Sequence, residues 1–231
     1  ASRIAAINEI HRQVDDVVSA ATTENTIQHL GTMKSRVVGY PGNRAAFDYV
    51  ERSFHDIGLE DIKIDTLRVT VPVDHGGRLT ILESGQQIPV HGLWPNRART
   101  TSLPPDGISG RLIYVGKGSW IEFDGMTVDG SIVLMDFDSA DHYLNARMLG
   151  AQAIIFIDNG VVTRGEAEEK IEEVPLNIPR FWISGDDARM LLENIENQTE
   201  IRLESRTTWE TVDTWNIYGY VYGTDEPWTT D

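Results

Sequence analysis

The chain has 231 residues, with 36 acidic and 20 basic side chains for a formal net charge of -16, 40% hydrophobic residues and no cysteine. This length and hydrophobic fraction indicate one large or two small folded domains and exclude a wholly disordered chain. The acidic balance disfavours nucleic acid as a partner, and the lack of cysteine excludes disulfides, thiolate nucleophiles and thiolate zinc ligands.

Residues 1–72 are predicted to form helices followed by a strand. Isoleucine and valine recur at spacings of three and four from Ile4 to Val18, which predicts an amphipathic helix whose apolar face packs against another element. A second short helix is predicted from Thr23 to Leu30. Charged residues exclude a signal peptide in the first twenty positions, and no apolar run approaches the roughly twenty residues that span a bilayer.

A third helix is predicted to follow Pro41-Gly42, with Asn43 as its cap and Gly58 as its end. The apolar residues from Ile62 to Val71 then alternate as in a strand, with a change of phase that suggests a bulge. Pro72 is expected to close this strand.

Residues 73–206 change to short strands, turns and two short helices. A hairpin is predicted where Leu79 to Glu83 and Ile88 to Leu93 flank Ser84-Gly85-Gln86. The apolar runs Ile132 to Met135 and Ala153 to Ile157 flank a helical stretch from Ala140 to Leu149, a pattern typical of a parallel βαβ unit buried on both faces.

The end of this middle part contains two more predicted strands. Ile178 to Ile183 is one, Ser184 is a candidate cap for the helix that follows, and Ile201 to Leu203 is the other. The acidic run from Glu166 to Glu173 is interpreted as a solvated face. Residues 207–231 hold a last strand candidate, Ile217 to Tyr222, and the chain then ends without an element to complete its sheet, so we expect an imposed end rather than a natural terminus.

The strongest candidate for an active site is Asp136-Phe137-Asp138, which directly follows an apolar strand. Carboxylates at this end of a parallel strand lie where open α/β sheets bind ligands, and the Asp-x-Asp pattern resembles that of the haloacid dehalogenase-like phosphatases. Gly185-Asp186-Asp187 could supply their second acidic motif. The simpler interpretation is that Asp138 or Ser139 caps a helix and that Asp186 and Asp187 enrich a first turn.

Other candidate sites are weaker. The six histidines include no pair within four residues, and the nearest approach to a metal cluster is Asp138, Asp141 and His142. Gly116-Lys117-Gly118-Ser119 lacks the spacing of a phosphate-cradling loop. Asn197-Gln198-Thr199 matches the common glycosylation pattern. From these residues alone we assign no catalytic or metal-ligating residue, and the substrate-binding residues stay unknown.

Three stretches together resemble one family. Residues 35–59, with the run Ser35-Arg36-Val37-Val38-Gly39-Tyr40-Pro41-Gly42-Asn43, are similar to the start of the zinc-dependent aminopeptidases related to glutamate carboxypeptidase and the transferrin receptor. Residues 128–134, 145–156 and 178–183 resemble the protease-associated domain inserted in many of these enzymes. Residues 215–225 resemble the strand by which the chain returns to the peptidase sheet.

The resemblance implies an α/β fold in three parts: 1–72, the N-terminal helices and first strand of a peptidase core; 73–206, the protease-associated domain; and 207–231, the return strand. It also implies that the two zinc ions and their His, Asp and Glu ligands belong to a catalytic domain after Asp231. The chain itself is then an inactive portion of a metallo-exopeptidase, with no cofactor of its own.

The resemblance further implies that the inserted domain influences which peptides enter the active site or mediates self-association. Trp94, Asn96, Arg97 and Arg99 form a candidate lid surface. The simpler interpretation, preferred here, has Trp94 packed under its own loop and the arginines solvated. The alternatives to a peptidase portion are a self-contained binding module with a protease-associated fold and, third, the phosphatase. The sequence leaves the cellular location open, with an extracellular or periplasmic one favoured.

Overall fold

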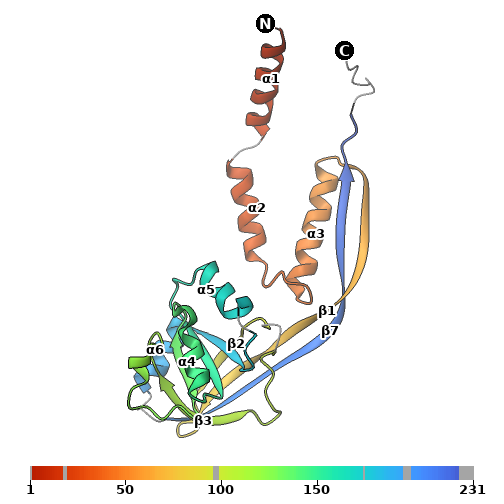
Figure 1. Cartoon of the computed structure of the whole chain (residues 1–231). Helices are drawn as coiled ribbons and strands as arrows, with labels where there is room; N and C mark the ends of the chain where they lie inside the picture. The colour runs from red at the N-terminus through yellow and green to blue at the C-terminus, as the bar shows by residue number, and fades with distance from the viewer. Residues whose placement is uncertain (1, 18–19, 96–98, 174, 195–198, 224–231) are drawn as a thin grey trace. The chain divides into compact units, whose positions relative to one another are not determined.

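The computed structural model describes residues 2–17, 20–95, 99–173, 175–194 and 199–223. They form a mixed α/β protein that divides into two compact units, one made of residues 1–71 and 211–231 and the other of residues 72–210. Figure 1 shows the elements in chain order by colour. The α/β class predicted from the sequence is confirmed.

The first unit holds three helices: α1 (Ser2–Val17), α2 (Ala20–Thr32) and α3 (Pro41–Asp56). Helix α3 packs on the C-terminal strand through Phe47 and Trp215, whose rings lie 5.0 Å apart, and the Arg44 guanidinium lies 4.5 Å from the Trp215 ring. The predicted apolar face of α1 is present but uncovered, since Ile4 is 67% and Ile10 is 57% exposed.

The predicted C-terminal end of α3 is confirmed, whereas its predicted N-cap residue is wrong. Tyr40 is the N-cap residue and its side chain makes no capping hydrogen bond, and Pro41 occupies the first helical turn, where its missing amide costs nothing. Asn43 therefore lies inside the helix, and its side-chain amide donates to the Arg36 carbonyl at 3.2 Å. After the last helical residue, Gly58 has φ +76°, the left-handed conformation that ends helices.

Two strands are much longer than predicted. Strand β1 (Glu60–Ile81) continues through Pro72, and β7 (Glu200–Tyr220) joins the two separately predicted strands into one. The prediction that Pro72 closes a strand is wrong because proline fits extended backbone and removes only one amide donor. Cross-strand pairs link β1 to β7, including Arg78 to Glu204 at 2.7 and 2.9 Å.

The second unit is built around a closed barrel with the strand order β1-β2-β6-β5-β4-β3-β7. Its remaining strands are β2 (Gln87–Gly92), β3 (Ile108–Tyr114), β4 (Ile132–Asp136), β5 (Ala153–Asp158) and β6 (Arg180–Ser184). Strands β3, β4, β5 and β6 are mutually parallel, whereas β1 with β2, β2 with β6 and β3 with β7 are antiparallel. The predicted hairpin is thus confirmed, because β1 and β2 pair around residues 82–86.

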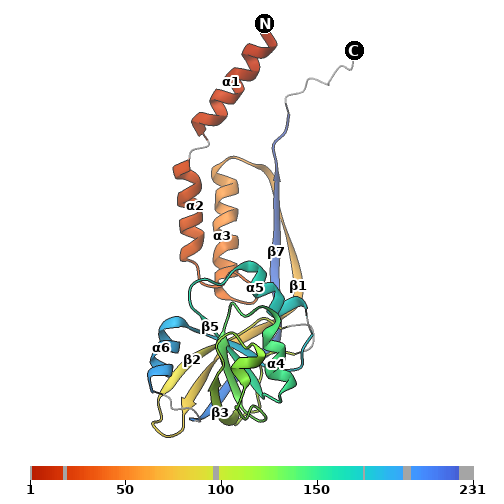
Figure 2. The same cartoon turned by 60° about the vertical axis from the view of Figure 1, so that its left-hand side comes forward.

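Short helices cover the sheet: η1 (Trp120–Phe123), η2 (Ala140–His142), α4 (Tyr143–Met148), α5 (Arg164–Glu168), the π-helix η3 (Glu169–Glu173) and α6 (Gly185–Asn194). Figure 2 shows α4 and α6 on opposite sides of this unit. The β4-α4-β5 crossover confirms the predicted βαβ unit.

The core explains the unbroken apolar runs of β4 and β5. Ile132 and Leu134 belong to one buried cluster, which also contains residues of α6, whereas Val133 and Met135 belong to a second cluster with Tyr143 of α4. Both faces of these central strands are buried, so polar alternation is absent from their sequences.

Candidate functional site

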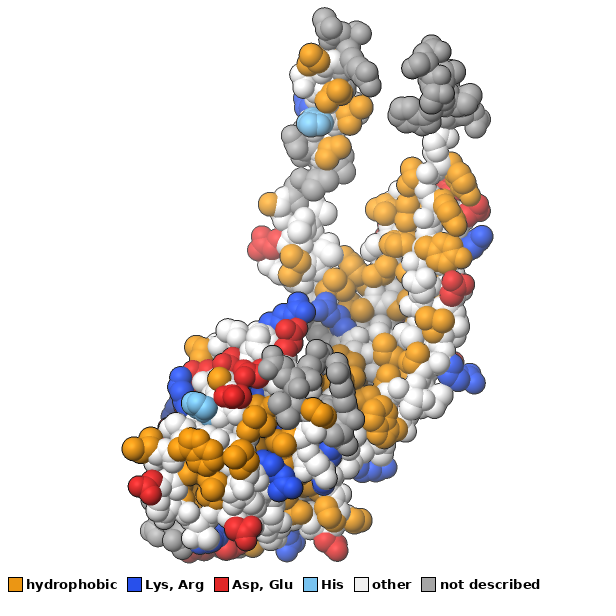
Figure 3. Space-filling view, in the orientation of Figure 1, with side chains coloured by type: hydrophobic (Ala, Val, Ile, Leu, Met, Phe, Trp, Pro, Cys, Tyr) orange, Lys and Arg blue, Asp and Glu red, His pale blue; other side chains and the backbone are white. Residues whose placement is uncertain are grey.

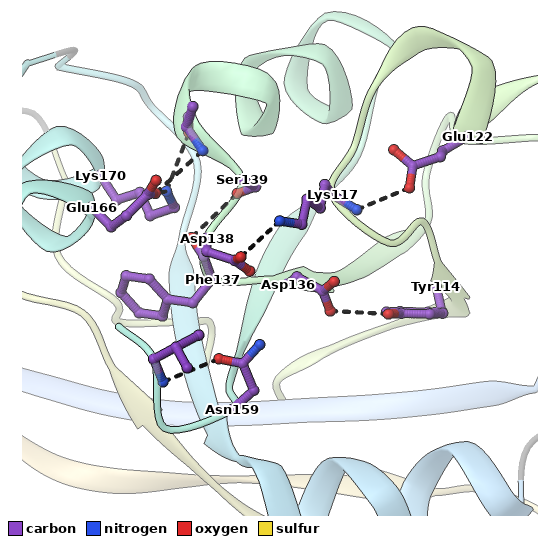
Figure 4. Close-up of polar contacts among 12 residues, drawn as sticks. Tyr114, Lys117, Glu122, Asp136, Phe137, Asp138, Ser139, Asn159, Glu166 and Lys170 are labelled. Atoms are coloured by element: carbon purple, nitrogen blue, oxygen red, sulfur yellow. Dashed lines mark hydrogen bonds and ion pairs between the residues drawn. The ribbon is translucent and has the colours of Figure 1, made fainter. Parts of the chain in front are cut away.

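Polar side chains gather at the carboxyl ends of the parallel strands, as Figure 4 shows. Strand β4 ends at Asp136, β5 at Asp158 and β6 at Ser184, and parallel strands place these ends at one edge of the sheet. A cavity of about 630 Å³ lies there, and Asp136, Asp158 and Asp186 are among its lining residues. The two acidic motifs singled out in the sequence, around 136 and around 186, thus reach a common cavity.

Asp136 is engaged by a tyrosine from the neighbouring strand. The Tyr114 hydroxyl donates to Asp136 Oδ1 at 2.9 Å. Partial burial, followed by this hydrogen bond to a carboxylate, raises the pKa of Tyr114 to about 12. Tyr114 therefore keeps its proton at neutral pH and acts as a hydrogen-bond donor rather than as a base.

Asp138 is engaged by a lysine. Lys117 Nζ lies 2.7 Å from Asp138 Oδ2, and this hydrogen bond, together with the charge of Lys117, holds the pKa of Asp138 below its usual value. The same contact raises the pKa of Lys117. Asp138 therefore does not cap the following helix, and the Ser139 hydroxyl donates instead to the Phe137 carbonyl at 3.4 Å. Of the two alternative caps, Ser139 does occupy the N-cap position of η2, but its side chain makes no capping hydrogen bond.

This ion pair predicts a pH-dependent contribution from Asp138. The pKa of Asp138 is lower in the folded protein than in the unfolded chain, so the stabilisation is present above the unfolded pKa of about 4 and is lost as the pH falls through the folded pKa. We expect the difference in urea midpoint between wild type and Asp138→Asn to be largest near pH 7 and to shrink as the pH falls below about 4. Urea unfolding at a series of pH values measures this difference in midpoint. A difference that stays the same at acidic pH would contradict the contribution of the ion pair between Lys117 and Asp138.

The loop from Gly116 to Ser119 is occupied by a carboxylate of the chain itself. Glu122 accepts from the Lys117 amide at 3.1 Å and from the Ser119 amide at 2.7 Å, and the Ser119 hydroxyl donates to it at 2.7 Å. These bonds, that of the Ser119 side chain first, lower the pKa of Glu122. The loop is therefore a capping box for η1 and leaves these two amides unavailable to a phosphate.

The acidic run after β5 contains a buried ion pair that the sequence analysis missed. Lys170 is fully buried, and its Nζ lies 2.6 Å from Glu166 Oε2 and 3.2 Å from the Ala140 carbonyl. Glu166 also accepts from the Ala140 amide at 3.2 Å. Because the Glu166 and Lys170 side chains are 23% and 0% exposed, the interpretation of this run as a solvated face is wrong for these two residues.

Three aromatic rings enclose the Lys170 amine. Its Nζ lies 5.5 Å from the ring centres of Phe137 and Phe156 and 5.8 Å from that of Tyr143. A cation over the faces of such rings is attracted by their quadrupoles. The free-energy cost of burying the Lys170 side chain is therefore offset by both the Glu166 carboxylate and the rings. The group anchors α5 and η3 to the turn after β4.

The second acidic motif has a structural role. The Ser184 hydroxyl accepts from the Asp187 amide at 3.1 Å, which confirms Ser184 as the cap of α6. The same hydroxyl donates to the Asp187 carboxylate at 2.6 Å, and Asp186 pairs with Arg189 at 3.1 Å. These acidic residues enrich the first helical turn, as the simpler interpretation predicted.

No group of three His, Asp or Glu side chains converges to hold a metal ion in the described ranges. Asp141 is exposed, and it does not combine with Asp138 and His142 into such a group. Asp136 and Asp138 have different partners, Tyr114 and Lys117, so each carboxylate is held by a separate hydrogen bond at this sheet edge.

A larger cavity, of about 840 Å³, lies beside the β1 and β7 segments of the same unit. Three side chains of its lining, those of His75, Arg78 and Glu204, contribute to strand pairing. His75 Nε2 lies 2.6 Å from Thr208 Oγ1 and 3.0 Å from Glu210 Oε1, and Arg78 pairs with Glu204. These contacts join the two strands.

The candidate lid surface is only partly described. Trp94 is 42% exposed, so it is not packed under its own loop as the preferred interpretation expected. Arg99 donates to the Asn177 side chain at 3.2 Å. Asn96 and Arg97 lie outside the described residues, as do Asn197 and Gln198 of the glycosylation pattern.

Comparisons with known proteins agree with this architecture. Residues 103–191 match the family model of the PA domain. They include the parallel strands β3 to β6 and most of α6. A search of curated protein sequences found no match.

Two solved structures share the fold of most of the chain. A zinc aminopeptidase from Bacillus subtilis is 18% identical, with a TM-score of 0.60, and the match covers 88% of this chain and 47% of that one. A peptidase M28 precursor from Shewanella amazonensis SB2B is 16% identical, with a TM-score of 0.52, and the match covers 83% of this chain and 48% of that one. The chain thus spans about half the length of the peptidases that it resembles. Helices long and apolar enough to cross a membrane are absent from the described residues.

Proposed function

We propose that this chain is the N-terminal and protease-associated portion of a zinc exopeptidase of the aminopeptidase class. The observation that carries the proposal is the combination of a PA-domain match at residues 103–191 with a structural likeness of 88% of the chain to 47% of a zinc aminopeptidase. In this proposal residues 1–72 and 207–231 belong to the peptidase core, and residues 73–206 are the inserted domain. The zinc ions and their ligands belong to a catalytic domain outside these residues.

The role proposed for this portion is to shape peptide access to the active site or to mediate protein association. The uncovered face of α1 supports the proposal that another part of the peptidase core packs against it. Its apolar residues Ile4, Ile7, Ile10 and Val14 are all about half exposed or more. In a complete peptidase core we expect this face to be covered. No residue of the chain is given a catalytic role.

The mass of the native protein tests the proposal. An antibody raised against this chain is used to blot the source organism, and the product is compared with the 25.9 kDa of the chain. We expect a much larger product, in which mass spectrometry finds sequence after Asp231 that contains the expected His, Asp and Glu zinc ligands. A native product of about 25.9 kDa would overturn the peptidase proposal and favour a self-contained binding module with the same fold.

Metal analysis of the isolated chain tests the non-catalytic role. We expect no stoichiometric zinc after dialysis and no release of amino acids from peptides, because a catalytic zinc needs converging nitrogen and oxygen ligands. The matched control is the full-length protein, which should retain zinc and cleave peptides. Tight stoichiometric zinc in the isolated chain would contradict the role proposed here.

A further inference from the structure

An apolar groove on the second unit is lined by one short helix and the turn that follows it. The groove has a volume of about 690 Å³, and its lining includes Trp120, Ile121, Met126 and Leu149. Trp120 is 56%, Ile121 is 82% and Met126 is 39% exposed. Hydrophobic side chains gather on the face of this unit shown in Figure 3, near α4.

The segment that carries these side chains is held firmly. The capping box of Ser119 and Glu122 fixes the start of η1, and Phe123 and Val128 are 5% and 4% exposed in the second core cluster. The apolar side chains of the groove are therefore held outward by a fixed backbone. Tryptophan supplies much of the binding energy at protein interfaces, and methionine adapts to varied partners.

The rim of the groove is acidic. Asp124 and Asp129 line it, and none of its lining residues is Lys, Arg or His. Among the described residues, no ion pair involves either carboxylate. Contiguous exposed apolar surface with a polar rim is typical of a site that binds another molecule.

We propose that this groove, here called the 120–129 groove, binds a polypeptide segment in which large apolar side chains are flanked by Lys or Arg. Its volume is within the range of natural ligand sites, about 300 to 1,000 Å³. The carboxylates attract cationic flanks, and the chain's net charge of -16 adds to this attraction. A second copy of the chain would bring an equally acidic rim, so charge disfavours self-association through this surface.

This inference deepens the association role in the proposed function and rests on it. The test is direct binding by the intact 231-residue chain, which does not involve zinc or the native mass. A failure to bind would therefore be distinguishable from a failure of the peptidase proposal.

The probe is a fluorescein-labelled, capped ten-residue peptide that alternates Leu or Phe with Lys or Arg, followed by fluorescence anisotropy. We expect binding that weakens with added salt, and we expect Ile121→Ser and Asp124→Asn each to weaken it roughly tenfold. Two matched peptides, with Glu in place of the basic residues or Ser in place of the apolar ones, should bind at least tenfold more weakly. Each variant must retain the wild-type urea midpoint.

The control variant is Val161→Ser, since Val161 is 59% exposed and does not line the groove. It should leave peptide affinity unchanged. Absence of binding, equal binding of the acidic peptide, or unchanged affinity in Ile121→Ser would overturn the proposal. So would sedimentation that shows a dimer of the chain abolished by Ile121→Ser, because the occupant would then be a second copy.

Discussion

Lys170→Ala is expected to lower the free energy of unfolding by about 3 kcal/mol, because it removes one partner of a buried ion pair. The Lys170 side chain is fully buried, and the substitution leaves Glu166, whose side chain is only 23% exposed, without this partner. The substitution also removes the contacts of Lys170 with three aromatic rings. Urea unfolding followed by circular dichroism measures the loss.

The same segment contains a matched control. Arg164 and Glu168 have the same four-residue spacing as Glu166 and Lys170, but their side chains are 89% and 48% exposed. Arg164→Ala should cost less than about 1 kcal/mol, as exposed pairs do. The double variant Lys170→Met with Glu166→Gln should lose less stability than Lys170→Ala, since it leaves no unpaired charge. Equal losses in Lys170→Ala and Arg164→Ala would contradict the buried pair.

Phe156→Ala is expected to cost about 3 to 5 kcal/mol, the range for removing a buried aromatic side chain. Phe156 lies at the centre of β5 and is fully buried, with its ring centre 5.3 Å from that of Phe137 and 6.1 Å from that of Tyr143. Truncation leaves a cavity between the sheet and α4. The measurement is again the free energy of unfolding in urea.

Phe156→Leu is the graded control, because it keeps much of the apolar volume and should cost clearly less than the alanine variant. Ile121→Ser, at a residue 82% exposed, should change stability by no more than about 0.5 kcal/mol. An alanine variant as stable as the wild type would show that the second core cluster does not depend on this ring.

The sequence predicted the elements whose signals are local. The apolar runs of β4 and β5 identified strands buried on both faces, and the structure places alternate residues of β4 in two core clusters. Ser184 and Gly58 marked helix ends through their own chemistry, one as a hydrogen-bond acceptor and the other through its positive φ.

Strand length was not predictable in the same way. Pro72 and the polar residues of β7 are poor strand signals, yet both strands continue through them. Pairing with a partner strand supplies the backbone hydrogen bonds that local propensity lacks, so neighbours in space decide how far a strand extends. Arg78 and Glu204, far apart in sequence, meet in this pairing.

Parts of the candidate site were equally hidden. The sequence placed Asp136 and Asp138 at a strand end, but their partners Tyr114 and Lys117 come from β3 and the loop after it. Lys170 could not be recognised as buried, because four of the five residues in η3 are charged. Its burial follows from aromatic rings on β5 and α4 and around the end of β4, which only the tertiary fold brings together.

The sequence by itself determined the α/β class, the parallel βαβ unit and the helix ends marked by Gly58 and Ser184, because periodicity and capping act over a few residues. Only the tertiary structure decided the barrel closure, the full length of β1 and β7, and which charges are buried. Those features depend on contacts between residues distant in the chain, whose free energies no local pattern records.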